Sequence, residues 1–143
     1  MCVGALALSF LVSLAALPAS AKSVDGLRTQ VPFAFHVGNK LIGAGACVVD
    51  SMSDDEALIR IRSGKEVTNI ITNSGRDHGN GAGRARLVFH RYGDQYFLVA
   101  VWGQDRTGRL LTETKRERSL RTETLTARGG AAAEPEVVTI DAR

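Results

Sequence analysis

The chain has 143 residues, with 18 Lys and Arg against 15 Asp and Glu, which gives a formal net charge of +3. This length favours a single domain with one hydrophobic core and excludes two full-sized domains. The net charge is mild for the size, which excludes the strongly basic composition typical of nucleic-acid binding, and we predict no nucleic-acid partner.

The first 21 residues form an apolar run that ends in Ala19-Ser20-Ala21, directly before the first charged residue, Lys22. An apolar run that ends in small residues is typical of a cleaved secretory signal, although the usual basic start is absent here. We predict a signal peptide over residues 1–21 and a mature protein that is soluble and periplasmic or secreted. The alternative is a retained membrane anchor, because the run approaches the roughly 20 apolar residues that span a bilayer.

Short alternating segments, separated by Gly, Asn and Asp, follow the apolar run and predict antiparallel strands. The expected strands are residues 29–37, 46–51, 57–62 and 66–72 and the two arms of a hairpin over 86–102. Pro32 cannot donate a ladder hydrogen bond, so the first strand lies at a sheet edge or begins just after Pro32. The prediction is an all-β, mainly antiparallel domain over residues 22–127, a six-strand meander that forms a small barrel or a sandwich.

The hairpin is the clearest predicted element, because two aromatic and β-branched runs flank the turn at Gly93-Asp94. Alternation in its second arm puts Phe97, Val99 and Val101 on one face and Tyr96, Leu98, Ala100 and Trp102 on the other. Since both faces are largely apolar, we expect both to be covered, by a second sheet, by barrel closure or by a helix.

Three further segments complete the predicted organisation. Residues 73–85 contain four glycines and predict a mobile loop, which lacks the Gly-Lys-Ser/Thr ending of a nucleotide-binding loop. A short charged surface helix is predicted over about residues 112–124, with Thr112 as its cap. Residues 128–143 are expected to form a flexible tail, with a late strand over residues 137–140 as the alternative.

Three blocks of the sequence form a distinctive pattern. They are Val31–Lys40 (VPFAFHVGNK), Leu87–Leu98 (LVFHRYGDQYFL) with the following Trp102, and the charged stretch that begins at Gly108-Arg109-Leu110. Together they resemble a family of small exported bacterial proteins, and the resemblance covers most of residues 29–123. Because the family has no established activity, the resemblance implies export and no catalytic or ligand-binding residues.

The residues that would carry catalysis or metal binding are few. A zinc site needs three or four converging ligands, and His36, His78 and His90 are the only histidines, without a close ligand motif among them. We therefore predict no metal and no cofactor. Removal of the signal leaves Cys47 as the lone cysteine, which excludes an internal disulfide. A buried, small hydrophobic role is the interpretation of Cys47, with a reactive thiol or an intermolecular bridge as the alternatives.

A basic stretch supplies the candidate interaction surface, which consists of Arg109, Lys115, Arg116, Arg118 and Arg121. A local surplus of positive charge can attach a protein to anionic lipid or polysaccharide. The interleaved glutamates instead favour an ordinary solvated helix, with attachment to an anionic surface as the alternative.

The predicted function is that of a non-enzymatic binding or interaction protein of the bacterial envelope, with an envelope partner that the sequence does not identify. One alternative is a small β-barrel carrier of an apolar ligand, which requires an empty interior. The other is an enzyme, which requires one of the three histidines to meet a carboxylate or Cys47 in a cleft. The sequence leaves the oligomeric state open.

Overall fold

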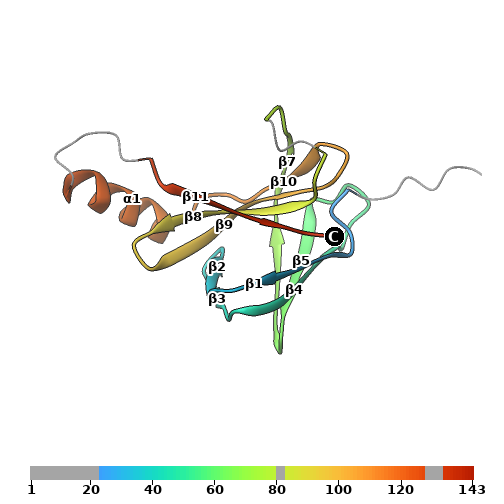
Figure 1. The fold of residues 1–143 in the computed structure, drawn as a ribbon, viewed down its shortest axis with the longest axis horizontal. Coiled ribbons are helices and arrows are strands. Elements are labelled where there is room, and N and C mark those ends of the chain that lie inside the picture. The colour runs from blue at the N-terminus through green and yellow to red at the C-terminus, as the bar shows by residue number, and fades with distance from the viewer. Residues whose placement is uncertain (1–22, 80–82, 128–133) are drawn as a thin grey trace, which may run out of the picture.

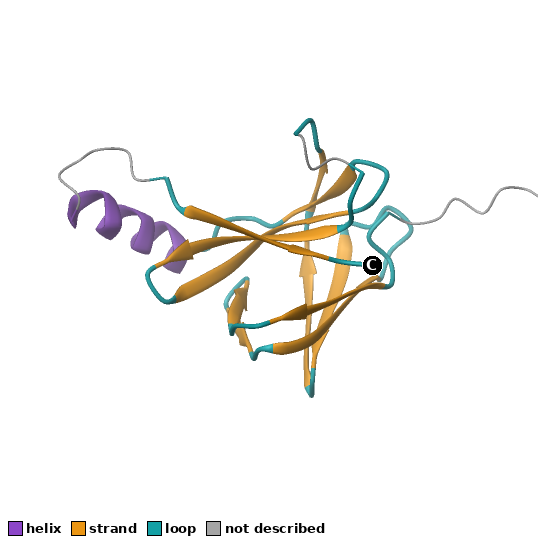
Figure 2. Ribbon diagram, viewed as in Figure 1, coloured by secondary structure: helices purple, strands orange, loops and turns teal. Residues whose placement is uncertain are grey.

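The computed structural model describes residues 23–79, 83–127 and 134–143, so the predicted signal peptide lies outside the described residues. These residues form a mainly β protein with one helix (Figure 2). The elements are β1 (Leu27–Val31), β2 (Phe35–Val37), β3 (Lys40–Ile42), β4 (Gly45–Ser51), β5 (Leu58–Ser63), β6 (Glu66–Ile71), β7 (Asn73–Arg76), β8 (Arg86–Tyr92), β9 (Gln95–Trp102), β10 (Thr107–Leu110), α1 (Lys115–Ala127) and β11 (Glu136–Asp141).

The strands belong to two sheets (Figure 1). The four-stranded sheet has the order β1-β4-β5-β6, and the seven-stranded sheet has the order β11-β8-β9-β10-β7 with β2 and β3 attached beside β9. The pairings are antiparallel except where β2 meets β9, at His36 and Phe97. The predicted all-β, mainly antiparallel class is confirmed. Neither sheet closes into a barrel, so the barrel prediction is wrong.

The single six-strand meander is also wrong, because the chain changes sheets three times. It leaves the four-stranded sheet after β1, returns to it at β4, and leaves again between β6 and β7 at Thr72. The predicted strand over residues 29–37 is therefore two strands, and the break falls at Pro32, which has no amide hydrogen to donate to a ladder. Consistent with the prediction from Pro32, β1 is an edge strand.

Three tight turns of the same design set the register of the hairpins. Gly38, Gly64 and Gly93 each take the first of two turn positions, with φ of +58°, +59° and +62°. A two-residue turn with glycine first in this conformation suits the right-handed twist of the flanking strands. The residue pairs that close these turns are Val37 with Lys40, Ser63 with Glu66, and Tyr92 with Gln95.

Both sheets contribute side chains to one hydrophobic core. Val31, Val49, Ile59 and Ile61 come from the four-stranded sheet, and Phe35, Ile42, Leu87, Phe89 and Val101 come from the other. Phe89 is fully buried, and the rings of Phe33 and Phe35 meet it edge-on, each at 5.2 Å between centroids. Phe33 also stacks on Tyr96 at 3.8 Å. Aromatic rings from three segments of the chain thus pack together in and against the core that the two sheets share.

A β-bulge changes which residues of β9 share a face. Val88 pairs with Ala100 but the next residue, Phe89, pairs with Leu98, which leaves Val99 as the extra residue. The Val99 carbonyl accepts a hydrogen bond from the Leu111 amide instead, at 2.9 Å. The predicted faces of this strand are therefore wrong beyond Leu98. Leu98 and Val101 lie in the core, whereas Phe97 and Ala100 are buried but do not belong to the core cluster.

Part of the predicted loop over residues 73–85 is a strand. β7 pairs with β10, and Gly75 lies opposite Gly108. A Cβ atom at Gly75 would lie 3.0 Å from Leu110 Cγ and 3.2 Å from the Trp102 ring. Glycine is therefore present at position 75 because neighbouring side chains occupy the space above it. Gly75, which argued for a loop, instead reflects close packing within a strand.

The helix begins later than predicted, and Thr114 caps it in place of Thr112. Thr114 Oγ1 accepts a hydrogen bond from the Glu117 amide at 3.1 Å, and the Thr114 carbonyl accepts from the Arg118 amide at 3.0 Å. This is the arrangement of an N-cap residue. The helix ends at Ala127, three residues beyond the predicted end, and extends away from the sheets (Figure 1).

The predicted flexible tail contains a strand. Residues 128–133 lie outside the described residues, but β11 follows them and pairs with β8 along its whole length. Residues 137–140, the alternative in the sequence interpretation, lie within β11. Beyond β11, the backbone of Arg143 exchanges hydrogen bonds with Arg28 of β1, at 2.8 and 2.9 Å. Long-range pairing therefore orders a segment whose composition favours flexibility.

Candidate functional site

A buried carboxylate between α1 and the seven-stranded sheet is the centre of the candidate site. Glu117 is 3% exposed, and its Oε1 lies 3.0 Å from Nδ1 of His90 and 3.4 Å from the hydroxyl of Tyr92. An ionised carboxylate only accepts hydrogen bonds, so His90 and Tyr92 are the donors. Glu117 follows Thr114 by three residues, the spacing of a capping box. Its side chain turns toward the sheet and joins α1 to β8.

Tyr92 is held as a hydrogen-bond donor. Its burial, and next the negative charge of Glu117, raise the pKa of Tyr92 to about 12. Because this value is far above physiological pH, the hydroxyl keeps its proton and donates to Glu117. Tyr92 also meets Phe97 edge-on at 5.9 Å, so its ring packs while its hydroxyl is bonded.

His36 lies beside this group on the same face of the sheet. The pairing of β2, β9 and β8 aligns His36, Phe97 and His90 across three strands. The His36 ring stacks on Phe97 at 4.7 Å, and its Nδ1 is buried without a hydrogen-bond partner among the described residues. Burial, and then the positive charge of Arg116, lower the pKa of His36, so the ring is neutral at pH 7.

The chemistry of this cluster is limited by what surrounds it. A histidine does meet a carboxylate, as the enzyme alternative requires. Glu117 also accepts a hydrogen bond from Tyr92, however, and it is buried at the first turn of α1. Among the hydrogen bonds of the described residues, none joins Cys47 to the pair; Cys47 lies on β4 of the four-stranded sheet, in the core that both sheets share. Within the described ranges, no group of three or more His, Cys, Asp and Glu side chains is placed to hold a metal ion. His78 lies on the surface, outside this cluster.

The structure separates Arg109 from the other four residues of the predicted interaction surface. Arg109 is 7% exposed, and its guanidinium donates to Thr72 Oγ1 at 2.9 Å, to the Thr72 carbonyl at 2.8 Å and to the Asp55 carbonyl at 3.3 Å. It therefore fastens β10 to the corner where the chain leaves the four-stranded sheet. The prediction that Arg109 contributes to an exposed surface is wrong, because backbone oxygens from distant segments bind it.

The remaining four residues, Lys115, Arg116, Arg118 and Arg121, are exposed on α1. Glu113 accepts from Arg118 at 3.4 Å and lies 3.1 Å from Arg121, and Arg116 donates to the neutral Gln95 side chain at 2.8 and 3.1 Å. The cation nearest the start of the helix, Lys115, has no partner among the hydrogen bonds and ion pairs of the described residues. The helix thus presents a partly compensated basic surface.

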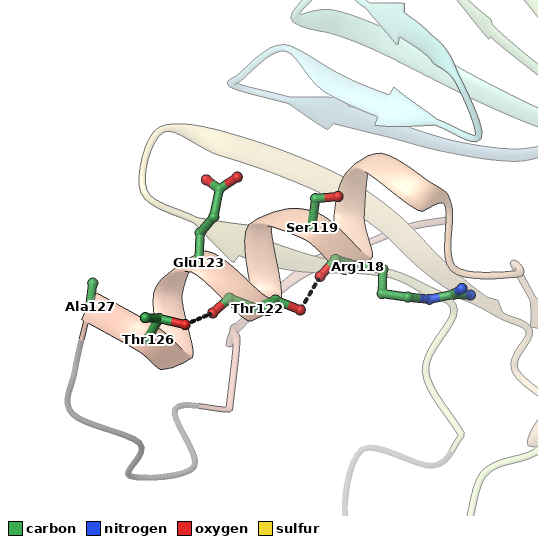
Figure 3. A pocket seen from close by; sticks show the side chains of 6 residues that line it. All are labelled: Arg118, Ser119, Thr122, Glu123, Thr126 and Ala127. Atoms are coloured by element: carbon green, nitrogen blue, oxygen red, sulfur yellow. Dashed lines mark hydrogen bonds between the residues drawn. The ribbon is translucent and has the colours of Figure 1, made fainter.

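The outward face of α1 forms a shallow hollow, which Figure 3 shows from close by. Among the described residues, it is lined by Arg118, Ser119, Thr122, Glu123, Thr126 and Ala127. The Thr122 and Thr126 hydroxyls donate to carbonyls one turn back, at 3.0 and 2.9 Å. Because these protons are already used within the helix, the hollow offers few free donors to a ligand.

Comparisons with protein-family models, with curated proteins and with solved structures give no match to this chain. The family resemblance of the sequence blocks therefore stays a prediction. Among the described residues, no helix has both the length and the apolar composition that crossing a bilayer requires.

Sequence reasoning missed the role of Glu117 and Tyr92. Glu117 was counted as one charge of a surface helix, yet it is the one buried residue of α1. The Thr114-x-x-Glu117 spacing was the available signal, because it places the start of the helix and a carboxylate in its first turn. No local pattern indicates that this carboxylate meets a histidine 27 residues earlier in the chain.

Cys47 lies in the core and is 1% exposed, which confirms the predicted buried role. Burial raises the pKa of its thiol to about 11, so the reactive thiolate is scarce at neutral pH. We expect the folded protein to react with a thiol-specific disulfide reagent at pH 8 at least about 100-fold more slowly than the protein unfolded in guanidinium. Absorbance of the released thiol measures both rates. Equal rates would contradict this burial.

Proposed function

We propose that this protein is a non-enzymatic interaction protein of the bacterial envelope that binds an anionic lipid surface through α1. One observation carries the proposal: α1 buries a single side chain, Glu117, and leaves Lys115, Arg116, Arg118 and Arg121 exposed. Burial of Glu117 removes a negative charge from the helix exterior. In this proposal the two sheets form an open sandwich that supports the helix.

Location and geometry support the proposal together. The signal-like pattern of residues 1–21 directs the chain to a compartment where anionic lipid is present. The helix extends beyond the sheets, so its cations can approach a surface without displacing the core (Figure 1). Apart from Ala127, its exposed residues are polar, so contact with a membrane would be electrostatic, without insertion. Each Lys or Arg near such a surface contributes about 1 kcal/mol at physiological salt.

The other two functions receive less support. An apolar-ligand carrier needs interior space, whereas Phe35 and Phe89 are fully buried in the core that both sheets share and their rings contact each other at 5.2 Å between centroids. The enzyme alternative requires a histidine to meet a carboxylate in a cleft. His90 does meet Glu117, at 3.0 Å, but this carboxylate is 3% exposed and also accepts a hydrogen bond from Tyr92, so it is not open to a substrate.

Vesicle sedimentation tests the proposal. We expect the purified protein to bind vesicles that contain phosphatidylglycerol, and to release them in high salt, where charges are screened. The double variant Lys115→Glu, Arg118→Glu should bind about 30-fold more weakly, because the loss of two contacts removes about 2 kcal/mol.

The control is the double variant Lys65→Glu, Arg84→Glu, which changes the net charge by the same amount at positions outside α1. It should bind the vesicles nearly as the wild type does. Equal loss in both double variants, or no loss in the helix variant, would refute a specific role of α1. Binding to an anionic polysaccharide but not to vesicles would refute the lipid as the partner.

A further inference from the structure

The strand β6 is an edge of the four-stranded sheet, and only the side chain of Lys40 makes a hydrogen bond to its outward backbone groups among the described residues. Its one partner among the described strands is β5. The opposite edge, β1, is different, because Arg143 exchanges two backbone hydrogen bonds with Arg28 and Pro32 follows the strand. An edge strand without such cover is a template for pairing with another strand.

The hairpin turn determines which backbone groups of β6 face outward. Ser63 and Glu66 close the two-residue turn as a hydrogen-bonded pair, and bonded pairs then alternate along the strands. The amide and carbonyl groups of Val67, Asn69 and Ile71 therefore point away from β5. The Lys40 ammonium confirms this direction, because it donates to the Val67 carbonyl at 2.6 Å.

The side chains of the same three residues are also available for contact. Val67 is 46% exposed and Ile71 is 75% exposed, the largest exposure of any large hydrophobic residue in the described chain. Both lie on the outer face of the sheet, with Asn69 between them. Thr68 and Ile70 alternate with them and are half-buried.

We propose that β6 pairs antiparallel with β6 of a second copy of the chain, about a two-fold axis at Asn69. In this register Val67 lies opposite Ile71 of the other copy, and Asn69 lies opposite its equivalent. Each outward amide then donates to an outward carbonyl of the other copy. The Lys40 ammonium gives up its hydrogen bond to the Val67 carbonyl, because an amide of the other copy takes its place.

The sequence of β6 is complementary to itself in this antiparallel register. The register places two β-branched apolar side chains opposite each other at both ends, a favourable cross-strand pair. The Asn69 oxygen already accepts from Arg60 Nε at 3.1 Å, but it has a second lone pair and the amide NH2 group can still donate, so the Asn69 side chains of the two copies can pair. The charged flanking residues meet neutral ones, since Glu66 lies opposite Thr72 and Lys65 opposite Asn73. No like charges oppose each other along the pairing.

The expected association is weak. One six-residue strand against its copy buries less than the roughly 1,200 Å² that a stable interface needs. A dissociation constant of about 0.1–1 mM is therefore expected. Such a dimer forms at high local concentration, and would join two four-stranded sheets into one continuous sheet.

Sedimentation equilibrium from about 10 µM to 1 mM tests the pairing. The protein is produced from its full sequence, so that the cell processes it as usual. We expect a concentration-dependent dimer, and an at least tenfold larger dissociation constant for Ile71→Lys. Val137→Lys is the matched control, because Val137 is a 61% exposed residue on β11, an edge strand of the other sheet.

Amide hydrogen exchange locates the contact in the same samples. Exchange at Val67, Asn69 and Ile71 should slow as the wild-type concentration rises, and should not slow in Ile71→Lys. A protein that stays monomeric at the highest concentration would overturn the proposal. A dimer that survives Ile71→Lys, or that Val137→Lys abolishes, would overturn it as well.

Discussion

Replacing Arg109 with Ala is expected to lower the free energy of unfolding by about 3 kcal/mol. The guanidinium donates to Thr72 Oγ1 and to the carbonyls of Thr72 and Asp55, and it is 7% exposed. Truncation removes these donors and leaves buried oxygens without partners, which is more costly than the loss of a solvated contact. Urea denaturation followed by circular dichroism measures the change.

Two controls define the cause of that loss. Arg109→Lys keeps the charge but lacks the planar group that reaches several oxygens, so it should recover only part of the stability. Arg62→Ala removes an ion pair with Asp50 in which the arginine side chain is 50% exposed, and it should cost under about 1 kcal/mol. If Arg109→Ala were as mild as Arg62→Ala, the buried anchor would be refuted.

Gly108→Ala is expected to destabilise the protein by about 3 kcal/mol or to prevent folding. A Cβ atom there would lie 2.5 Å from Cε3 of Trp102 and would overlap the Val101 carbonyl oxygen. The overlap with Val101 involves backbone, so rotation of a side chain cannot relieve it. Thermal and urea unfolding measure the loss, and yield of soluble protein reports a failure to fold.

Gly43→Ala provides the control for this overlap. The nearest atom to a Cβ at Gly43 is Glu66 Oε2, at 3.4 Å, which is an ordinary contact with a flexible side chain. We expect a change within about 1 kcal/mol. Comparable effects of the two substitutions would show that β7, β9 and β10 do not pack as closely as described.

The parts of the fold that sequence could predict are those governed by neighbouring residues. Alternation identified the strands around Ile59 and Val49, and the Gly93-Asp94 turn identified the central hairpin, because a two-residue turn sets its own register. The edge position of β1 followed from Pro32. These features depend on contacts within a few residues, which a single sequence displays.

The parts that failed depend on contacts between distant segments. The bulge at Val99 has no local signature, and it moves Val101 and Phe97 to opposite faces. β7 was hidden by Gly75, whose place is explained only by Trp102 and Leu110. β11 is ordered by its pairing with β8, across a segment that composition marks as flexible.

The candidate site shows the same division. The exposed cations of α1 were predicted because a charged, weakly apolar segment belongs on a surface. Arg109 stood in the same basic stretch, but its acceptors are 37 and 54 residues away in sequence. The hydrogen bond between His90 and Glu117 could not be predicted from the sequence either, because the two residues are 27 positions apart. Only the general requirement for a carboxylate beside a histidine could be stated from the sequence.

The hydrogen bonds between Arg28 and Arg143 have a consequence for biogenesis. They join residues from opposite ends of the described chain, and β11 completes the seven-stranded sheet. Folding with such high contact order is slow, typically milliseconds to seconds, and cannot be complete before residues 136–143 are available to pair. Until then β8 has only β9 as a neighbour in its sheet, and Arg28 lacks the two backbone hydrogen bonds that Arg143 supplies.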